Sequence, residues 1–168
     1  MRRRLVLLMI KIKIISVGSL KEKYFIDAAK EYQKRLSAFC GFEAIEISPE
    51  RLSDNPTEKE IALALKKEAA AIQKKLPSGS LKVAMCIEGK QMPSERFSKL
   101  INEAAVNGKG CIVFLIGSSY GLDDELKKLC DIKMSMSEMT FPHKLARVML
   151  TEQIYRAFKI SGGGTYHK

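Results

Sequence analysis

The residues best suited to chemistry lie in turns of the second half of the chain. Residues 117–121 read GSSYG, in which two glycines let the backbone approach a ligand and two serines offer hydroxyl and N–H groups. Residues 136–141 read MSEMTF, which combines apolar side chains with exposed main chain and suits a purine in an apolar slot. Each segment has a plainer alternative: a strand-to-helix turn that needs a positive φ, and a packed connector.

A third turn, residues 85–90, reads MCIEGK. We expect an apolar strand to end here and turn at Gly89, while Lys90 adds a charge that can also be simply solvated. Ligands of open parallel sheets bind beyond the carboxyl ends of the strands. Because all three turns follow predicted strands, we expect ligand-binding chemistry at that edge of the sheet.

The C-terminal residues 165–168 read TYHK and follow three glycines. A phenol, an imidazole and an ammonium group together suit phosphate contact, base stacking and proton transfer. The helix predicted before them carries Arg156 four positions after Glu152, so a helix-surface ion pair is the alternative role for this arginine.

Composition indicates a phosphate-bearing partner without naming one. The net charge is +10, from 29 basic and 19 acidic residues, which attracts polyanions over a long range, although many basic proteins bind no nucleic acid. The four cysteines form no CxxC pair, so we expect reduced thiols and a cytoplasmic location. Only His143 and His167 could join them as ligands, and we expect no metal site.

The first nine residues, MRRRLVLLM, resemble a signal peptide only faintly. Their apolar run continues into an alternating strand pattern, has no small-residue cleavage site and is too short to span a membrane. We therefore interpret residues 1–9 as an extension and residues 10–168 as a single domain.

Apolar periods of about two and 3.6 residues alternate along the chain and predict its elements. The strands are expected at residues 11–17, 42–47, 81–87, 111–116 and 132–136. The helices are expected at residues 22–36, 57–76, 93–106, 123–129 and 142–160, the second opening with a capping box from Thr57 to Glu60. This order predicts an α/β fold with a mostly parallel sheet of five to six strands and helices on both faces.

Together, the GSSYG turn, the segment SEMTFPHKLARVMLTEQIYRAFKI (residues 137–160) and the terminal YHK resemble the RlmH family. These small SPOUT-class methyltransferases modify N3 of a pseudouridine in the RNA of the large ribosomal subunit, and the resemblance runs from about Ile10 to Lys168. It implies an α/β-knot fold with a C-terminal trefoil knot, a homodimer, and ribosomal RNA as partner, with neither membrane nor DNA. Because bases in helical stems are hard to reach and the sequence indicates no separate RNA-binding domain, we expect recognition of the RNA in the assembled ribosome.

The resemblance also implies S-adenosylmethionine as methyl donor and assigns its contacts. These are Met85, Gly117, Met136, Ser137, Glu138, Met139, Thr140 and Phe141. The sequence departs from the family pattern twice, with Met85 where leucine is common and Ser118 where a second glycine is common. The methionine preserves an apolar wall, and the serine fits if its φ is negative.

For catalysis the resemblance points to Arg156, Tyr166 and His167, and for RNA contact to His143, Arg147 and Lys168. His167 is a possible base for the proton on N3, and Tyr166 could stack on or orient the base. Arg156 and Lys168 could hold phosphate or stabilise an ionised pyrimidine.

Two other classes of function are weighed against this one. A Rossmann-type methyltransferase or dehydrogenase would place GxGxxG after the first strand, whereas Gly18 stands alone there. A non-catalytic RNA-binding or ribosome-assembly protein fits the charge and the size of the chain. Binding of S-adenosylmethionine would separate this last class from an enzyme.

Overall fold

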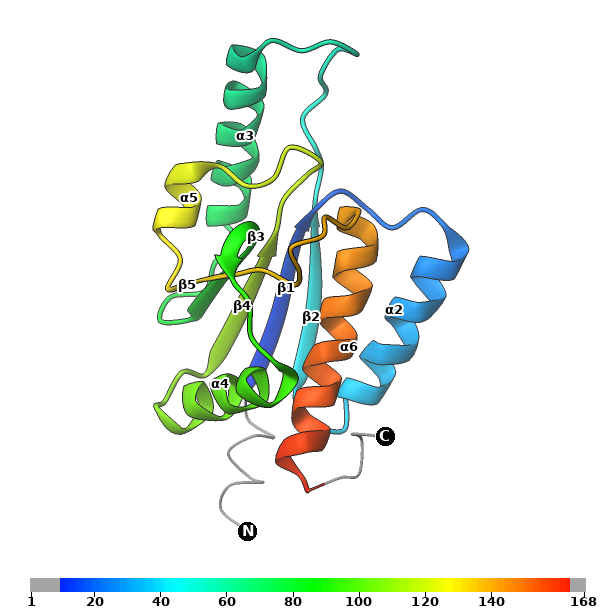
Figure 1. The fold of residues 1–168 in the computed structure, drawn as a ribbon, viewed down its shortest axis with the longest axis vertical. Helices are drawn as coiled ribbons and strands as arrows, with labels where there is room; N and C mark the ends of the chain where they lie inside the picture. Colours follow the sequence, from blue (N-terminus) through cyan, green and yellow to red (C-terminus); the bar gives the residue numbers. More distant parts are fainter. Residues whose placement is uncertain (1–9, 164–168) are drawn as a thin grey trace.

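The structure is a computed structural model, and it describes residues 10–163. Strands and helices alternate along the chain as predicted (Figure 1). The strands are β1 (Lys11–Val17), β2 (Gly41–Ile47), β3 (Leu81–Lys90), β4 (Cys111–Ile116) and β5 (Ile132–Met134). The helices are α2 (Lys23–Leu36), α3 (Glu58–Gln73), α4 (Ser94–Val106), α5 (Asp124–Lys128) and α6 (His143–Ser161).

The five strands form one sheet in the order β2-β1-β4-β3-β5, and every neighbouring pair is parallel. This confirms the predicted α/β class and its parallel sheet. The apolar strand β4 lies at the centre, and its side chains from Ile112 to Ile116 are buried, as expected for a strand covered on both faces. The trefoil knot stays a prediction from the resemblance.

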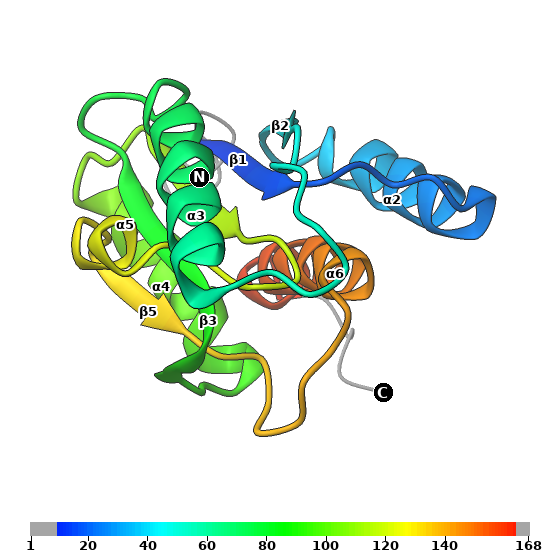
Figure 2. The same cartoon turned by 90° about the horizontal axis from the view of Figure 1, so that it is seen from above.

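Successive strand side chains point to opposite faces of the sheet and build two separate cores. Ile12, Ile14 and Phe114 face one core, which α2, α4 and α6 cover. Ile15, Val113 and Leu115 face the other, which α3 and α5 cover. Figure 2 shows α3 and α5 on the side of the sheet away from α6 and α2.

Two predicted strand ends are wrong, and one glycine explains both. β3 runs on to Lys90 and β5 stops at Met134. The backbone of Gly89 lies so close to β5 that a Cβ there would come 2.6 Å from the Met134 nitrogen. β3 can therefore shift register and pair Lys90 with Met134, after which the Ser135 N–H donates to the Lys90 carbonyl at 3.2 Å.

Helix α3 begins as its sequence predicts. The Thr57 N–H donates to the Glu60 carboxylate at 2.7 Å, and the Glu60 N–H donates to the Thr57 hydroxyl at 3.3 Å. Two free backbone donors at the helix start are thereby satisfied reciprocally, which fixes where α3 starts beside the sheet.

Candidate functional site

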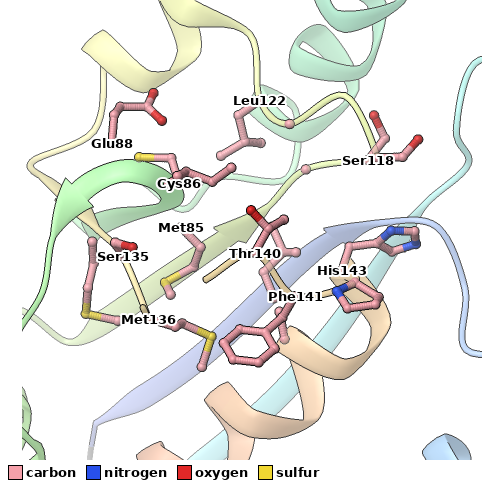
Figure 3. Close-up of a pocket in the computed structure, with 18 of the residues that line it drawn as sticks. Met85, Cys86, Glu88, Ser118, Leu122, Ser135, Met136, Thr140, Phe141 and His143 are labelled. Carbon is pink, nitrogen blue, oxygen red and sulfur yellow. The ribbon is translucent and has the colours of Figure 1, made fainter. Parts of the chain in front are cut away.

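A cavity of about 710 Å³ opens at the carboxyl ends of β3, β4 and β5 (Figure 3). The three turns expected to carry chemistry meet there, and α5 and the start of α6 complete its wall. Seven of the eight residues expected to contact the methyl donor line this cavity: Met85, Gly117, Met136, Ser137, Met139, Thr140 and Phe141. Glu138 is the exception and does not line it.

The turn after β4 owes its shape to two glycines with different roles. Gly121 has a φ of +85°, which L side chains rarely adopt. Gly117 has no positive φ, but a Cβ there would overlap the Gly121 carbonyl and come 2.8 Å from the Leu122 nitrogen. The turn thus needs the absence of a side chain at Gly117 and an unusual backbone conformation at Gly121.

Ser118 fits this turn without strain. No residue other than glycine has a positive φ between residues 10 and 163, so the condition set for a serine at this position is met. Its hydroxyl donates to the Glu68 carboxylate at 3.1 Å, and its carbonyl accepts from the Gly121 N–H at 2.9 Å. The hydroxyl is thus directed toward α3.

The segment after β5 holds its own shape through serine side chains. The Ser135 hydroxyl donates to the Ser137 carbonyl at 2.9 Å, and the Ser137 hydroxyl accepts from the Met139 N–H at 3.0 Å. Figure 2 shows this segment leaving β5 and looping outward before it enters α6. Met139 on the loop is 73% exposed although it is apolar, and Met136 and Phe141 face the cavity (Figure 3).

The end of β3 adds an ion pair to this mainly apolar wall. The ammonium group of Lys127 on α5 pairs with the carboxylates of Glu88 and, at 2.8 Å, of Asp124. The hydrogen bond from Lys127 lowers the pKa of Glu88 below its usual value. Glu88 and Lys127 both line the cavity, and their pairing leaves it without a net charge from these two groups.

The start of α6 brings His143 to the cavity from the opposite side. Burial lowers the pKa of His143, and the neighbouring Lys144 ammonium lowers it further, which favours the neutral imidazole. Lys144 itself pairs with Glu22 at 2.8 Å. A neutral ring is compatible with a cationic ligand nearby.

Arg147, expected to contact RNA, points into the fold. The residue is 8% exposed, and its guanidinium donates to the Glu46 carboxylate at 2.6 Å and to the Ser16 hydroxyl at 3.3 Å. In this chain it joins α6 to the carboxyl ends of β1 and β2. Nothing in this placement presents its charge to a partner.

Arg156 does not approach the cavity within one chain. It lies thirteen positions after His143 on α6, roughly 20 Å along the helix axis. Its guanidinium pairs with Glu152 at 2.7 Å, as the spacing of four predicts. Figure 1 shows α6 running from the carboxyl edge of the sheet to the opposite end of the molecule. Tyr166, His167 and Lys168 lie outside the described residues.

Several residues of the site were not predicted from the sequence. Ser135 and Leu122 line the cavity beside the expected residues (Figure 3), and Lys127 enters it from α5. Cys86 and Glu88 belong to the expected turn of residues 85–90 but were not expected to contact the donor themselves. Ser135 and Leu122 directly adjoin the expected segments in the sequence, and this adjacency was the signal that could have identified them. Within residues 10–163, no three His, Cys, Asp or Glu side chains gather closely enough to hold a metal ion.

A comparison with protein families matches residues 10–167 to the family described as "Predicted SPOUT methyltransferase". This chain belongs to the SPOUT methyltransferase family. A ribosomal RNA large subunit methyltransferase H from Streptococcus pyogenes serotype M5 (strain Manfredo) is 51% identical to this SPOUT methyltransferase over 158 residues. That alignment covers 94% of this chain and 99% of the relative. The relative of that name from serotype M12 (strain MGAS2096) is 50% identical over the same shares.

Solved structures show the same fold for this SPOUT methyltransferase. A probable methyltransferase from Bordetella pertussis Tohama I superposes with a TM-score of 0.60 at 12% identity, over 94% of this chain and 98% of the other. A probable methylase family protein from Haemophilus influenzae Rd KW20 gives a TM-score of 0.55 at 15% identity, over 96% of this chain and 71% of the other.

No helix within residues 10–163 is both long enough and apolar enough to cross a membrane.

Proposed function

We propose that this SPOUT methyltransferase transfers a methyl group from S-adenosylmethionine to N3 of a pseudouridine in large-subunit (23S) ribosomal RNA. The observation that carries the proposal is that three turns from separate strands meet in one cavity. This arrangement occurs in a chain that is 51% identical over 158 residues to a ribosomal RNA large subunit methyltransferase H. The target atom, N3 of the pseudouridine, is proposed from the resemblance of residues 137–160 to the RlmH family.

The residues present fit this donor. A cavity of about 710 Å³ is within the usual range for cofactors, and its walls combine apolar side chains with exposed main chain. Met85, Met136 and Phe141 offer apolar contact to an adenine ring, and the close backbone of the Gly117 turn leaves main-chain groups accessible. S-adenosylmethionine supplies an electrophilic methyl carbon, so the protein mainly has to hold the acceptor in line with it.

The acceptor nitrogen must lose its proton as it gains the methyl group. We assign that proton to His167 and stacking or orientation of the base to Tyr166. Arg156 and Lys168 would hold phosphate or stabilise the ionised pyrimidine. His143 lines the cavity and is available to the incoming nucleotide, whereas Arg147 is already paired inside the fold.

The position of Arg156 supports a proposed homodimer. Arg156 lies ten positions after Ala146, the last α6 residue that lines the cavity, which is roughly 15 Å along the helix axis and beyond the reach of its side chain. A second copy whose α6 end approaches the cavity would bring its arginine and terminal residues to the donor. We therefore propose that each active site takes its donor pocket from one chain and its acceptor-binding groups from the other.

Calorimetry with S-adenosylmethionine tests the donor. Saturable heat supports the enzyme, and no heat with or without ribosomes would favour the ribosome-assembly protein instead. Mass mapping of ribosomal RNA from cells lacking the gene then locates the methyl group. We expect one large-subunit pseudouridine to lose its methyl group, and an unchanged map would refute the proposed substrate.

Substrate form is tested with the purified enzyme. Residues 10–163 form one sheet with its covering helices and include no separate RNA-binding domain, so we expect methylation of ribosomal particles and little or none of a free stem-loop with the same sequence. Equal rates on both would contradict recognition of the assembled ribosome.

A further inference from the structure

Glu68 on α3 is the one acidic residue among residues 10–163 that the fold buries, with 5% of its surface exposed. It lies in a stripe of buried residues at helical spacing, with Ala64 one turn before it and Ile72 one turn after it. A carboxylate at such a position is costly unless hydrogen bonds replace the lost water. The hydrogen-bond donors to Glu68 therefore indicate its role in the fold.

Both carboxylate oxygens of Glu68 accept a hydrogen bond, and the two donors come from different loops. The Glu50 N–H, in the loop after β2, donates to one oxygen at 3.0 Å. The Ser118 hydroxyl, in the turn after β4, donates to the other at 3.1 Å. One buried side chain thus joins α3 to two loops that are distant in sequence.

The turn after β4 is closed by its own backbone, and the Ser118 hydroxyl joins it to α3. A second cavity of about 80 Å³ lies between the turn, α3 and the loop after β2. Glu68, Ser118 and Tyr120 all line it. Side chains that border this open space make fewer packing contacts there, so the bond from Ser118 to Glu68 contributes more to holding the turn against α3.

We propose that Glu68 is a positioning residue for the methyl donor, acting through Ser118. Glu68 does not line the donor cavity itself. Its carboxylate holds the Ser118 hydroxyl toward α3 and so keeps the backbone of residues 117–121 in the shape that lines the donor cavity. This inference rests on the proposed function, since it assumes that the cavity binds S-adenosylmethionine.

Donor affinity measured by calorimetry on the full chain tests the inference. Glu68→Ala removes both hydrogen bonds, and Ser118→Ala removes only the one to the turn. We expect each variant to bind S-adenosylmethionine roughly tenfold more weakly. Glu58→Ala, an exposed glutamate at the start of the same helix, is the matched control and should bind like the wild type.

The double variant distinguishes positioning from a general loss of structure. If Glu68 acts through Ser118, Glu68→Ala should weaken binding by less than about twofold in the Ser118→Ala background. Two independent tenfold losses that multiply would overturn the inference. If Glu68→Ala fails to fold, as circular dichroism will show, Ser118→Ala alone still tests the bond, and wild-type affinity in that variant would refute it.

A conservative variant provides a rescue. In Glu68→Gln the amide oxygen can still accept from Glu50, and the amide nitrogen can donate to the Ser118 oxygen. We expect binding within about threefold of the wild type. A loss as large as that of Glu68→Ala would show that donor affinity depends on the negative charge of Glu68 and not on its hydrogen bonds, and it would overturn the inference. If the wild type itself shows no heat with the donor, the proposed function fails rather than the role of Glu68.

Discussion

The carbonyl of Gly121 occupies the space that a Cβ on Gly117 would need. This contact closes the turn after β4 on itself, and Gly121 completes it with a φ of +85°. Residues 117–121 are therefore a fixed backbone cradle at the edge of the donor cavity.

Gly117→Ala should weaken donor binding. The new Cβ collides with backbone, which cannot give way as a flexible side chain would, so the turn must open. We expect the affinity for S-adenosylmethionine to fall at least tenfold and stability to fall by about 1–3 kcal/mol. Calorimetry and urea denaturation measure the two effects.

Gly110→Ala is the control for this change. A Cβ at Gly110 would meet no heavy atom within 4 Å, and this glycine lacks a positive φ, so alanine should be tolerated there. Wild-type affinity in Gly117→Ala would mean that the turn does not shape the donor site.

Protonation of His143 should weaken both the fold and donor binding. Its folded pKa is lowered from 6.5, so between the folded pKa and 6.5 the unfolded chain binds more protons than the folded one. Stability therefore rises with pH across this window and is lost as the pH falls below about 6.5. A protonated ring in the cavity would also repel the cationic sulfonium.

His143→Asn removes this titration. We expect the difference in free energy of unfolding between about pH 7.5 and about pH 5.5 to shrink in the variant, and donor affinity to depend less on pH. Urea denaturation and calorimetry at both pH values measure this. Identical pH profiles in the two proteins would exclude His143 as the titrating group.

The sequence predicted the fold well where local physics decides. The unbroken apolar run of β4 indicated a strand buried on both faces, and the capping box located the start of α3. The extension of β3 to Lys90 was missed because it depends on Gly89 lying against Met134, a contact between separate segments. The order of the strands depends on such contacts as well.

The residues of the functional site also fall into those that the sequence could predict and those that depend on contacts between separate segments. Turns after parallel strands must share one edge of the sheet, so Gly117 and Phe141 could be placed together from the sequence. Lys127 enters the cavity from α5 through its pairing with Glu88, and nothing local indicates this. The burial of Glu68 had a usable signal, a lone acidic residue at helical spacing among alanines and isoleucines.

Cys86 should report on donor binding by its alkylation rate. It lines the cavity, and burial together with the Glu88 carboxylate raises the pKa of its thiol, so it reacts slowly. We expect saturating S-adenosylhomocysteine to slow its reaction with iodoacetamide at least fivefold, as read from peptide mass spectrometry, because the ligand covers the thiol.

Cys111 and Cys40 are the controls for that measurement. Cys111 lies at the start of β4, away from the cavity, and its rate should not change with ligand. Burial raises the pKa of Cys40 to about 12, so it should stay unmodified in the folded protein. Equal protection of Cys86 and Cys111 would indicate global stabilisation instead of occupancy of the cavity.

Replacing Arg147 should separate a structural role from contact with RNA. Arg147→Met keeps much of the length of the side chain but breaks the bonds to Glu46 and Ser16. Since the Glu46 side chain is 41% exposed, its freed charge can be hydrated, and we expect a loss of about 1–2 kcal/mol in the free energy of unfolding. Lys23→Met, which breaks an exposed pair with Asp27, should cost less than about 0.5 kcal/mol.

Ribosome binding at several salt concentrations completes the test of Arg147. A side chain that neutralises a phosphate contributes about one unit to the slope of log affinity against log salt. Because Arg147 is already paired inside the fold, we expect Arg147→Met to leave that slope unchanged once the protein is confirmed to be folded. A slope reduced by about one unit, with stability intact, would show that Arg147 exchanges Glu46 for an RNA phosphate in the complex.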